Sequence, residues 1–195
     1  MNTKNILIII VVLILVITAG YKALAVNISN KEVNKIMEGK KVLIVYYSYS
    51  GNTEFIAKKI QAKTGGDLFK IETEKPYPAS YNEVVEQAKQ EKAEDYRPKI
   101  KSIPENIQEY DIIFLGTPVW WYTMAPPLKT FLSQVDLKEK IVVPFCTHGG
   151  GGASSTFSDI KKLASQANIQ EGLEIYSRGN NSTDKEIDLW IMQLK

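Results

Sequence analysis

Short apolar runs alternate with longer polar, helix-forming stretches along residues 41–195. Val42–Tyr47 is apolar throughout, too short for a helix and rich in Val, Ile and Tyr, as is typical of a strand buried on both faces. Similar runs predict four further strands, at Leu68–Ile71, Asp111–Gly116, Ile141–Cys146 and Leu173–Tyr176. Between and after them the pattern predicts helices at Thr53–Lys63, Ser80–Asp95, Lys129–Val135, Phe157–Ala167 and Asp184–Leu194. This alternation predicts an α/β protein with a parallel sheet, right-handed crossovers and helices on both faces.

The N-terminal segment has a different pattern, because Ile6–Ile17 is an unbroken aliphatic run. It matches the apolar region of a signal peptide, with a small-x-small cleavage site at Ala23–Ala25. Extended to Val26, with Lys22 reaching the interface, it is also long enough for a membrane anchor. Both interpretations predict targeting to a membrane. More lysines follow the run than precede it, which favours a domain on the cytoplasmic face over export.

Pattern and composition together give the domain organisation and exclude several classes of protein. We expect a signal peptide or anchor over residues 1–25, a polar linker over 26–40 and one domain over 41–195. Without Lys4 and Lys22 the chain has 22 basic and 22 acidic residues, and its lysines form no cluster typical of nucleic-acid binding. The single cysteine excludes an internal disulfide, and with the single histidine leaves too few ligands for a zinc site.

Three segments follow the carboxyl ends of predicted strands, where ligands bind in parallel sheets. The first, Ser48–Thr53, combines three hydroxyl side chains, a glycine and an asparagine where a helix begins. Unpaired amides at a helix start and nearby hydroxyls make a neutral donor site that suits a phosphate dianion. Neither G-x-x-x-x-G-K-[ST] nor G-x-G-x-x-G is present, which favours a single terminal phosphate. The alternative is a simple turn in which Asn52 caps the helix.

The second segment, Thr117–Met124, has three consecutive aromatic residues. They cannot all point into one core, so we expect some rings at the surface, where they could stack on a flat conjugated ring. The alternative is that Trp120 or Trp121 packs beneath the helices.

The third segment, Thr147–Ser155, has four glycines that allow close backbone approach to a ligand. His148 could donate a hydrogen bond to a ring carbonyl, or it could simply be solvated. We expect Cys146 to be a small buried apolar group.

From Lys41 onward the chain resembles flavodoxins, and in particular a branch with G-x-P-x-W-W and T-x-G-G loops. The residues that carry the resemblance are Ser48–Thr53 (SYSGNT), Gly116–Trp121 (GTPVWW) and Phe145–Gly150 (FCTHGG). The resemblance implies a three-layer sandwich with five parallel strands in the order 2-1-3-4-5, and one non-covalent FMN. The residues it implies at the FMN phosphate are Ser48, Ser50, Gly51, Asn52 and Thr53, with Tyr49 in the same segment; those beside the ring are Pro118, Val119, Trp120, Trp121 and Tyr122; those at its other edge are Thr147, His148, Gly149 and Gly150.

Two features depart from the family pattern. The domain has no net charge, whereas flavodoxins that shuttle electrons are usually acidic, so steering toward a basic partner is not expected. Many flavodoxins have a glycine beside flavin N5, and Val119–Met124 has none.

The resemblance leaves three functions open. The first, which we favour, is a membrane-associated FMN electron carrier. Apolar walls around the ring would disfavour charge on the reduced flavin. The expected partners are redox proteins or small quinone-like acceptors. The second is an FMN-dependent NAD(P)H:quinone or azo-compound oxidoreductase, for which the Gly-rich loop leaves room but no nicotinamide motif is visible. The third is an interaction domain without FMN. No catalytic residue and no metal ligand are predicted, and a serine hydrolase is disfavoured because G-x-S-x-G is absent.

Overall fold

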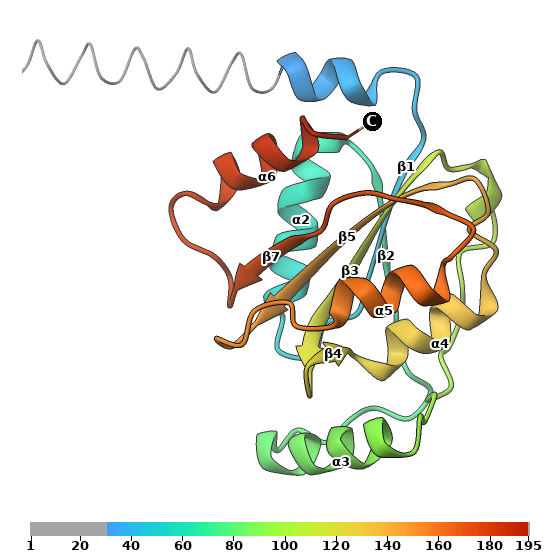
Figure 1. The fold of residues 1–195 in the computed structure, drawn as a ribbon, viewed down its shortest axis with the longest axis vertical. Helices are drawn as coiled ribbons and strands as arrows, with labels where there is room; N and C mark the ends of the chain where they lie inside the picture. The colour runs from blue at the N-terminus through green and yellow to red at the C-terminus, as the bar shows by residue number, and fades with distance from the viewer. Residues whose placement is uncertain (1–30, 195) are drawn as a thin grey trace, which may run out of the picture.

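The computed structural model describes residues 31–194 and shows a sheet enclosed by helices on both faces (Figure 1). Its strands are β1 (Val42–Tyr46), β2 (Asp67–Lys70), β3 (Ile112–Trp120), β4 (Thr123–Met124), β5 (Ile141–His148), β6 (Asn168–Ile169) and β7 (Leu173–Tyr176). The order is β2-β1-β3-β5-β6, with β7 also paired to β5, and only β4 is antiparallel to its neighbour. The α/β prediction is confirmed. The sheet has seven strands where the resemblance implies five, and β6 and β7 both pair with β5 at the edge where one strand was expected. The pattern did not predict β4 or β6, because two-residue strands have no detectable periodicity.

The central strands are apolar at every position because both faces of the sheet are covered. All residues of β1 are buried, and they divide by the period of two expected of a strand. Leu43 and Val45 join the core on one face, and Ile44 and Tyr46 join the core on the other. Each large side chain fully buried in this way stabilises the fold by about 1.5–3 kcal/mol.

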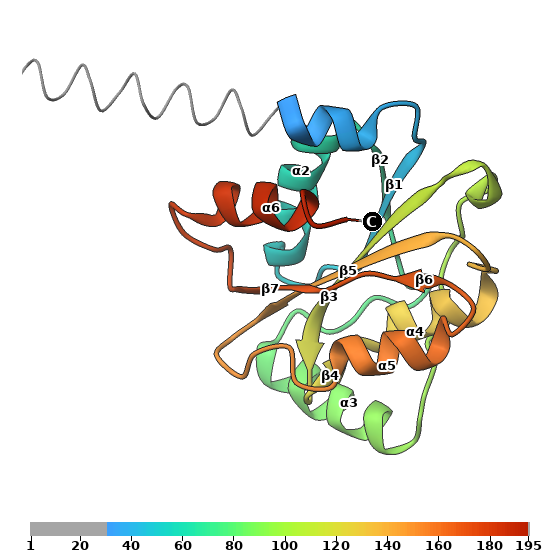
Figure 2. The same ribbon diagram turned by 45° about the horizontal axis from the view of Figure 1, so that its top comes forward.

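Two pairs of helices cover the two faces, as Figures 1 and 2 show from different directions. The helices α2 (Asn52–Thr64) and α6 (Thr183–Ile191) lie on one face, and α4 (Pro126–Gln134) and α5 (Thr156–Leu163) lie on the other. Lys63 and Asp188 form a largely buried ion pair that joins α2 to α6, with 2.7 Å between Nζ and Oδ1. The predicted three-layer arrangement is therefore present.

Residues 31–37, which the sequence pattern places in a polar linker, form a helix that packs on the domain. Val33 and Met37 are buried in the same core as Ile44 and Ile60. Two apolar residues four positions apart lie on one face of a helix, which is how a short, lysine-bearing segment becomes part of the core. The linker prediction for 26–40 therefore does not describe these residues. The expected membrane segment lies outside the described residues, and no helix within residues 31–194 is long and apolar enough to cross a bilayer.

The helix α3 (Tyr81–Ala93) stands apart from the two main layers, near the carboxyl ends of β3 and β5 (Figures 1 and 2). It lies in an excursion between β2 and β3 that is closed at its base by antiparallel pairing of Thr73 with Ile100. Inside it, the Tyr77 hydroxyl donates to the buried Glu91 at 2.6 Å. This excursion places α3 beside the region where a parallel sheet binds its ligands.

Candidate functional site

The segment Ser48–Thr53 turns sharply from β1 into α2, and Gly51 makes the turn possible. Gly51 has a φ of 85°, a left-handed backbone conformation that side-chain-bearing residues rarely adopt, and its carbonyl accepts from the Phe55 amide at 3.0 Å. The amides of Asn52 and Thr53 have no acceptor among the described residues. The start of α2 thus offers free N–H groups and the positive end of the helix dipole, as predicted for an anion site.

The hydroxyl groups around this turn are held in defined positions. Ser48 Oγ accepts from the Glu54 amide at 3.2 Å, which leaves its own O–H free to donate to a ligand. The Thr53 and Thr147 hydroxyls, both buried, lie 2.8 Å apart and share a hydrogen bond. If Thr147 donates, the Thr53 hydrogen is free to point toward the turn. Ser50 is exposed and makes no hydrogen bond to a described residue.

Arg178 stands beside the same turn and was missed by the sequence analysis. Its Nε donates to Asn52 Oδ1 at 3.1 Å, and its guanidinium lies 5.8 Å from the centre of the Phe55 ring. The sequence analysis described this site as neutral, but Arg178 places a positive charge beside it. Arg178 lies two residues after the last predicted strand, in the kind of position where ligand-binding residues are found. No local pattern, however, shows that this strand ends next to α2.

Thr117–Met124 is not the open loop that the sequence predicted. Strand β3 extends to Trp120, because residues as far as Pro118 pair with β5 and the last two pair with β4. Trp121 and Tyr122 form a two-residue hairpin turn with φ values of 47° and 69°. Positive φ at both positions is typical of a type I′ turn, where Asn and Gly are favoured. Two aromatic residues in this conformation are strained, by about 1–2 kcal/mol each.

Contacts with two helices hold this strained turn. From α3, Lys92 Nζ donates to the Trp121 carbonyl at 2.6 Å, and Trp121 Nε1 in turn donates to the Val85 carbonyl at 2.8 Å. From the start of α5, the Ser155 amide donates to the Tyr122 carbonyl at 3.0 Å. Strain that persists under such restraint is found mostly at functional sites.

Asp159 supports the same turn from α5. Its Oδ2 accepts from the Thr123 and Ser155 hydroxyls at 2.8 and 2.6 Å. Partial burial raises the pKa of this carboxyl, but hydrogen bonds from Ser155, Lys162 and Thr123 outweigh it and hold the pKa below its usual range. Asp159 is therefore ionised at neutral pH and fixes the far side of the turn.

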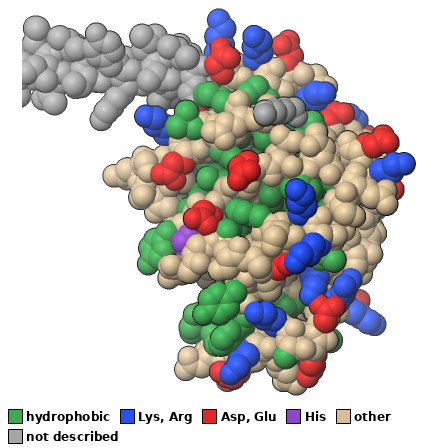
Figure 3. Space-filling model, in the orientation of Figure 1, with side chains coloured by type: hydrophobic (Ala, Val, Ile, Leu, Met, Phe, Trp, Pro, Cys, Tyr) green, Lys and Arg blue, Asp and Glu red, His purple; other side chains and the backbone are tan. Residues whose placement is uncertain are grey.

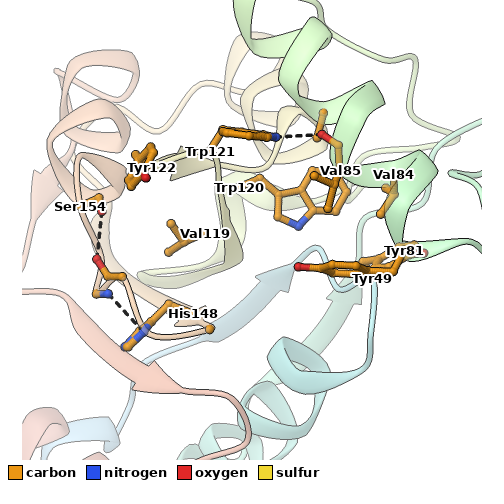
Figure 4. Close-up of a pocket in the computed structure, with 14 residues that line it drawn as sticks. Tyr49, Tyr81, Val84, Val85, Val119, Trp120, Trp121, Tyr122, His148 and Ser154 are labelled. Atoms are coloured by element: carbon orange, nitrogen blue, oxygen red, sulfur yellow. Dashed lines mark hydrogen bonds between the residues drawn. The ribbon is translucent and has the colours of Figure 1, made fainter.

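A pocket of about 420 Å³ lies between the turn, α3 and the Gly-rich segment (Figure 4). Its lining residues are Tyr49, Tyr81, Val84, Val85, Ala88, Val119, Trp120, Trp121, Tyr122, His148, Gly149, Gly151, Gly152 and Ser154. The volume is in the range of small-molecule sites, and the lining is mostly aromatic or aliphatic. Trp120 forms one wall, edge-on to Tyr47, Tyr49 and Tyr77 with ring centres 5.0–5.9 Å away. The pocket therefore suits a flat, apolar ring system.

His148 organises the Gly-rich segment at the other edge of this pocket. Its Nδ1 accepts from the Gly150 and Gly152 amides at 3.1 and 3.2 Å. The neutral imidazole then carries its hydrogen on Nε2, which makes no hydrogen bond to a described residue and can donate to a ligand. Glu174 on β7 holds the same segment by accepting from the Ala153 amide at 2.6 Å. In Figure 3 the single histidine of the chain, coloured purple, borders hydrophobic surface on one side.

The structure brings together most, but not all, of the predicted site residues. Predicted residues that line the pocket are Tyr49, Val119, Trp120, Trp121, Tyr122, His148 and Gly149. Pro118 and Thr147 pair with each other across β3 and β5 instead, and Gly150 is not among the residues that line the pocket. Ser48 and Ser50–Thr53 lie apart from the pocket lining, in the turn at the start of α2 next to Tyr49. Burial and the nearby Glu174 raise the pKa of the Cys146 thiol to about 12, so it is an inert core group as expected.

The sequence analysis predicted a helix at Ser80–Asp95 but missed the contribution of α3 to the pocket. Tyr81, Val84, Val85 and Ala88 line the pocket. Their spacing of three, four and seven residues defines one apolar face of a helix, so the signal was present. What the sequence could not show is that this face meets the aromatic turn and not the sheet.

These features define an α/β protein with an anion site at a helix start and an aromatic pocket beside it. The flavodoxin family model matches residues 41–194, and the chain belongs to the flavodoxin family. It is 29% identical over 120 residues to a flavodoxin from Haemophilus influenzae, a match that covers 60% of this chain and 52% of the relative. The chain thus spans about half the length of that curated relative.

Solved structures show the same fold. A crystal structure of a candidate flavoprotein from Bacteroides eggerthii is 32% identical, with a TM-score of 0.70, and the match covers 80% of this chain and all of that one. A flavoprotein from Lactobacillus acidophilus, crystallised in complex with FMN, is 28% identical with a TM-score of 0.65, and the match covers 78% of this chain and 99% of that one.

Proposed function

We propose that this protein binds one FMN non-covalently and carries electrons. The observation that supports this best is the adjacency of two sites with different chemistry: the free amides and hydroxyls at the start of α2, and the apolar pocket of about 420 Å³ that begins at Tyr49. FMN has the same two parts, a phosphate dianion and a flat ring system. The FMN complex of the Lactobacillus acidophilus flavoprotein supports this assignment.

The residues of the chain divide between the two parts of the cofactor. Ser48, Gly51, Asn52 and Thr53 hold the phosphate through backbone amides and hydroxyls. At the ring, Trp120 supplies an aromatic wall and His148 Nε2 a hydrogen-bond donor. FMN supplies the redox chemistry when bound, and these residues bind it, orient it and exclude water from one side.

Spectroscopy of the full-length chain purified in detergent tests this proposal. Flavin absorbance in the purified protein, or quenching of added FMN fluorescence with one-to-one stoichiometry, is expected. The flavin released by heating should be identified as FMN by chromatography. A colourless protein that does not bind added FMN would contradict the proposal and favour an interaction domain without cofactor.

A second candidate is an FMN-dependent NAD(P)H:quinone or azo-compound oxidoreductase. One observation favours it: a further pocket of about 340 Å³ lies on the other side of Trp120, between α3 and α5. A second substrate could bind near the ring there or along the exposed Gly149–Gly151 segment. Steady-state oxidation of NADPH with a quinone or azo dye would establish this function, and absence of turnover in FMN-loaded protein would exclude it.

We also propose that Ile6–Ile17 and its flanks attach the domain to a membrane, with the domain on the cytoplasmic face. The support is the apolar run itself and the excess of lysine after it. Attachment would raise the concentration of the domain near membrane-bound redox partners. Protease accessibility in intact and lysed cells distinguishes the two faces, and a shift in mass would show cleavage near Ala25.

A further inference from the structure

We propose that Arg178 binds the phosphate of the cofactor and makes the site selective for phosphorylated flavin. The inference rests on the proposed function, because it concerns the same FMN. It adds a positive charge to a phosphate site that the sequence describes as made of neutral groups.

The position of the guanidinium carries the proposal. Its Nε is tied to Asn52 Oδ1 at 3.1 Å, at the first residue of α2. Its Nη2 would lie only 3.4 Å from a Cβ atom placed on Gly51, so it stands directly against the open side of that glycine. Asn52 and Gly51 are the same residues whose backbone forms the anion site. The charge is therefore within reach of a phosphate bound there.

Hydrogen bonds on both sides of Arg178 hold the turn that carries it. Ser177 and Gly179 both have left-handed backbone conformations, with φ values of 53° and 77°. The Ser177 amide donates to the His148 carbonyl at 2.9 Å, and the Asn180 amide donates to Thr183 Oγ1 at 2.8 Å. A Cβ on Gly179 would lie 2.1 Å from that same Oγ1, so the turn requires a glycine there. The path of this turn directs Arg178 toward α2.

The charge of Arg178 is not neutralised within residues 31–194, where no carboxylate forms an ion pair with it. The neighbouring cation Lys59 differs, because its Nζ lies 2.9 Å from Asp184 Oδ1. A planar guanidinium with Nε engaged still has four N–H groups on its terminal nitrogens, which match the oxygens of a phosphate. Phe55, whose ring lies 5.8 Å from the guanidinium, supports it from below.

This arrangement predicts selectivity by charge. A dianionic phosphate gains from both the helix start and Arg178, whereas riboflavin, which has the same ring and no phosphate, gains from neither. Arg178 is exposed to solvent, so screening reduces its effect below that of a buried pair.

The experiment compares FMN and riboflavin affinities of the full-length apoprotein by fluorescence quenching, in wild type, Arg178→Gln and Arg178→Lys. In Arg178→Gln we expect FMN affinity to fall about tenfold and riboflavin affinity to stay unchanged. Arg178→Lys, which keeps the charge, should recover much of the loss. Higher salt should weaken FMN binding more in wild type than in Arg178→Gln.

Arg97→Gln is the matched control, because the other arginine of the chain pairs with Asp95 away from the site and should leave both affinities unchanged. An unchanged ratio of FMN to riboflavin affinity in Arg178→Gln would overturn the inference, as would an equal loss for both flavins. Failure of the wild type to bind FMN would instead contradict the proposed function.

Discussion

The two ends of the candidate flavin site are built in different ways. The phosphate end is largely one contiguous segment, Ser48–Thr53, whose geometry follows from a glycine turn at a helix start. The ring end is assembled from β3, α3 and the Gly-rich segment, and it contains a hairpin turn that its own residues disfavour. Local sequence therefore defines the anion site, whereas the ring site depends on distant contacts that hold a strained conformation in place.

Removal of the aromatic wall should have the largest effect. Trp120→Ala deletes a ring that contacts Tyr47, Tyr49 and Tyr77, so we expect the free energy of unfolding to fall by about 2–4 kcal/mol. Because the ring site is shared by both ligands, FMN and riboflavin affinities should fall together. Thermal unfolding and fluorescence titration measure the two effects. A loss of FMN affinity without a loss of riboflavin affinity would contradict the assignment of Trp120 to the ring end of the site.

The opposite pattern is expected at the phosphate end. Ser50→Ala combined with Thr53→Val removes two hydroxyls and leaves Thr147 Oγ1 without its buried partner. We expect FMN affinity to fall at least tenfold and the protein to lose about 1–3 kcal/mol of stability, with little change in riboflavin affinity. Titration with both flavins checks this, and Ser158→Ala on the exposed surface of α5 serves as control. Unchanged FMN affinity would show that the phosphate binds elsewhere.

The strained turn provides a test of how the ring end is held. Replacing Trp121 and Tyr122 with Asn and Gly, which favour the observed backbone, should relieve about 2–4 kcal/mol of strain. It also removes two pocket-lining rings, so flavin affinity should fall although the turn itself becomes easier to form. Chemical denaturation and titration separate the two quantities. Lower stability with intact binding would show that the rings stabilise the fold more than the strain opposes it.

A smaller, pH-dependent effect is expected from Asp159. Its pKa is lowered in the folded state, so it stabilises the fold above the unfolded-state pKa, and this contribution is lost as pH falls through the folded-state pKa. Asp159→Asn should reduce the free energy of unfolding by about 0.5–1 kcal/mol at neutral pH, with the difference disappearing in acid. Urea denaturation at several pH values measures it. A difference that persists in strong acid would contradict an electrostatic role.

The sequence pattern predicted the α/β class, and the resemblance to flavodoxins implied the strand order and the candidate site residues. Particular elements show where these predictions stopped. Val42–Tyr47 and Asp111–Gly116 were recognisable because complete burial requires an unbroken apolar run. The predicted strand ended at Gly116, because the proline and aromatic residues that follow resemble a loop. In the structure β3 continues to Trp120, since these residues pair with β5 and β4. Residues 31–37 looked like a polar linker because only Val33, Ile36 and Met37 in this segment pack on the core, while the rest is polar.

By itself the sequence determined the α/β class and the glycine turn with free amides at the start of α2, because both depend on residues close along the chain: apolar periodicity and a glycine at a helix start. Tertiary structure alone decided that Arg178 stands beside Asn52, 126 positions away, and that α3 closes the ring pocket. Such contacts depend on the path of the whole sheet. The energy that holds Trp121 and Tyr122 in a disfavoured conformation likewise comes from α3 and α5, outside the turn itself.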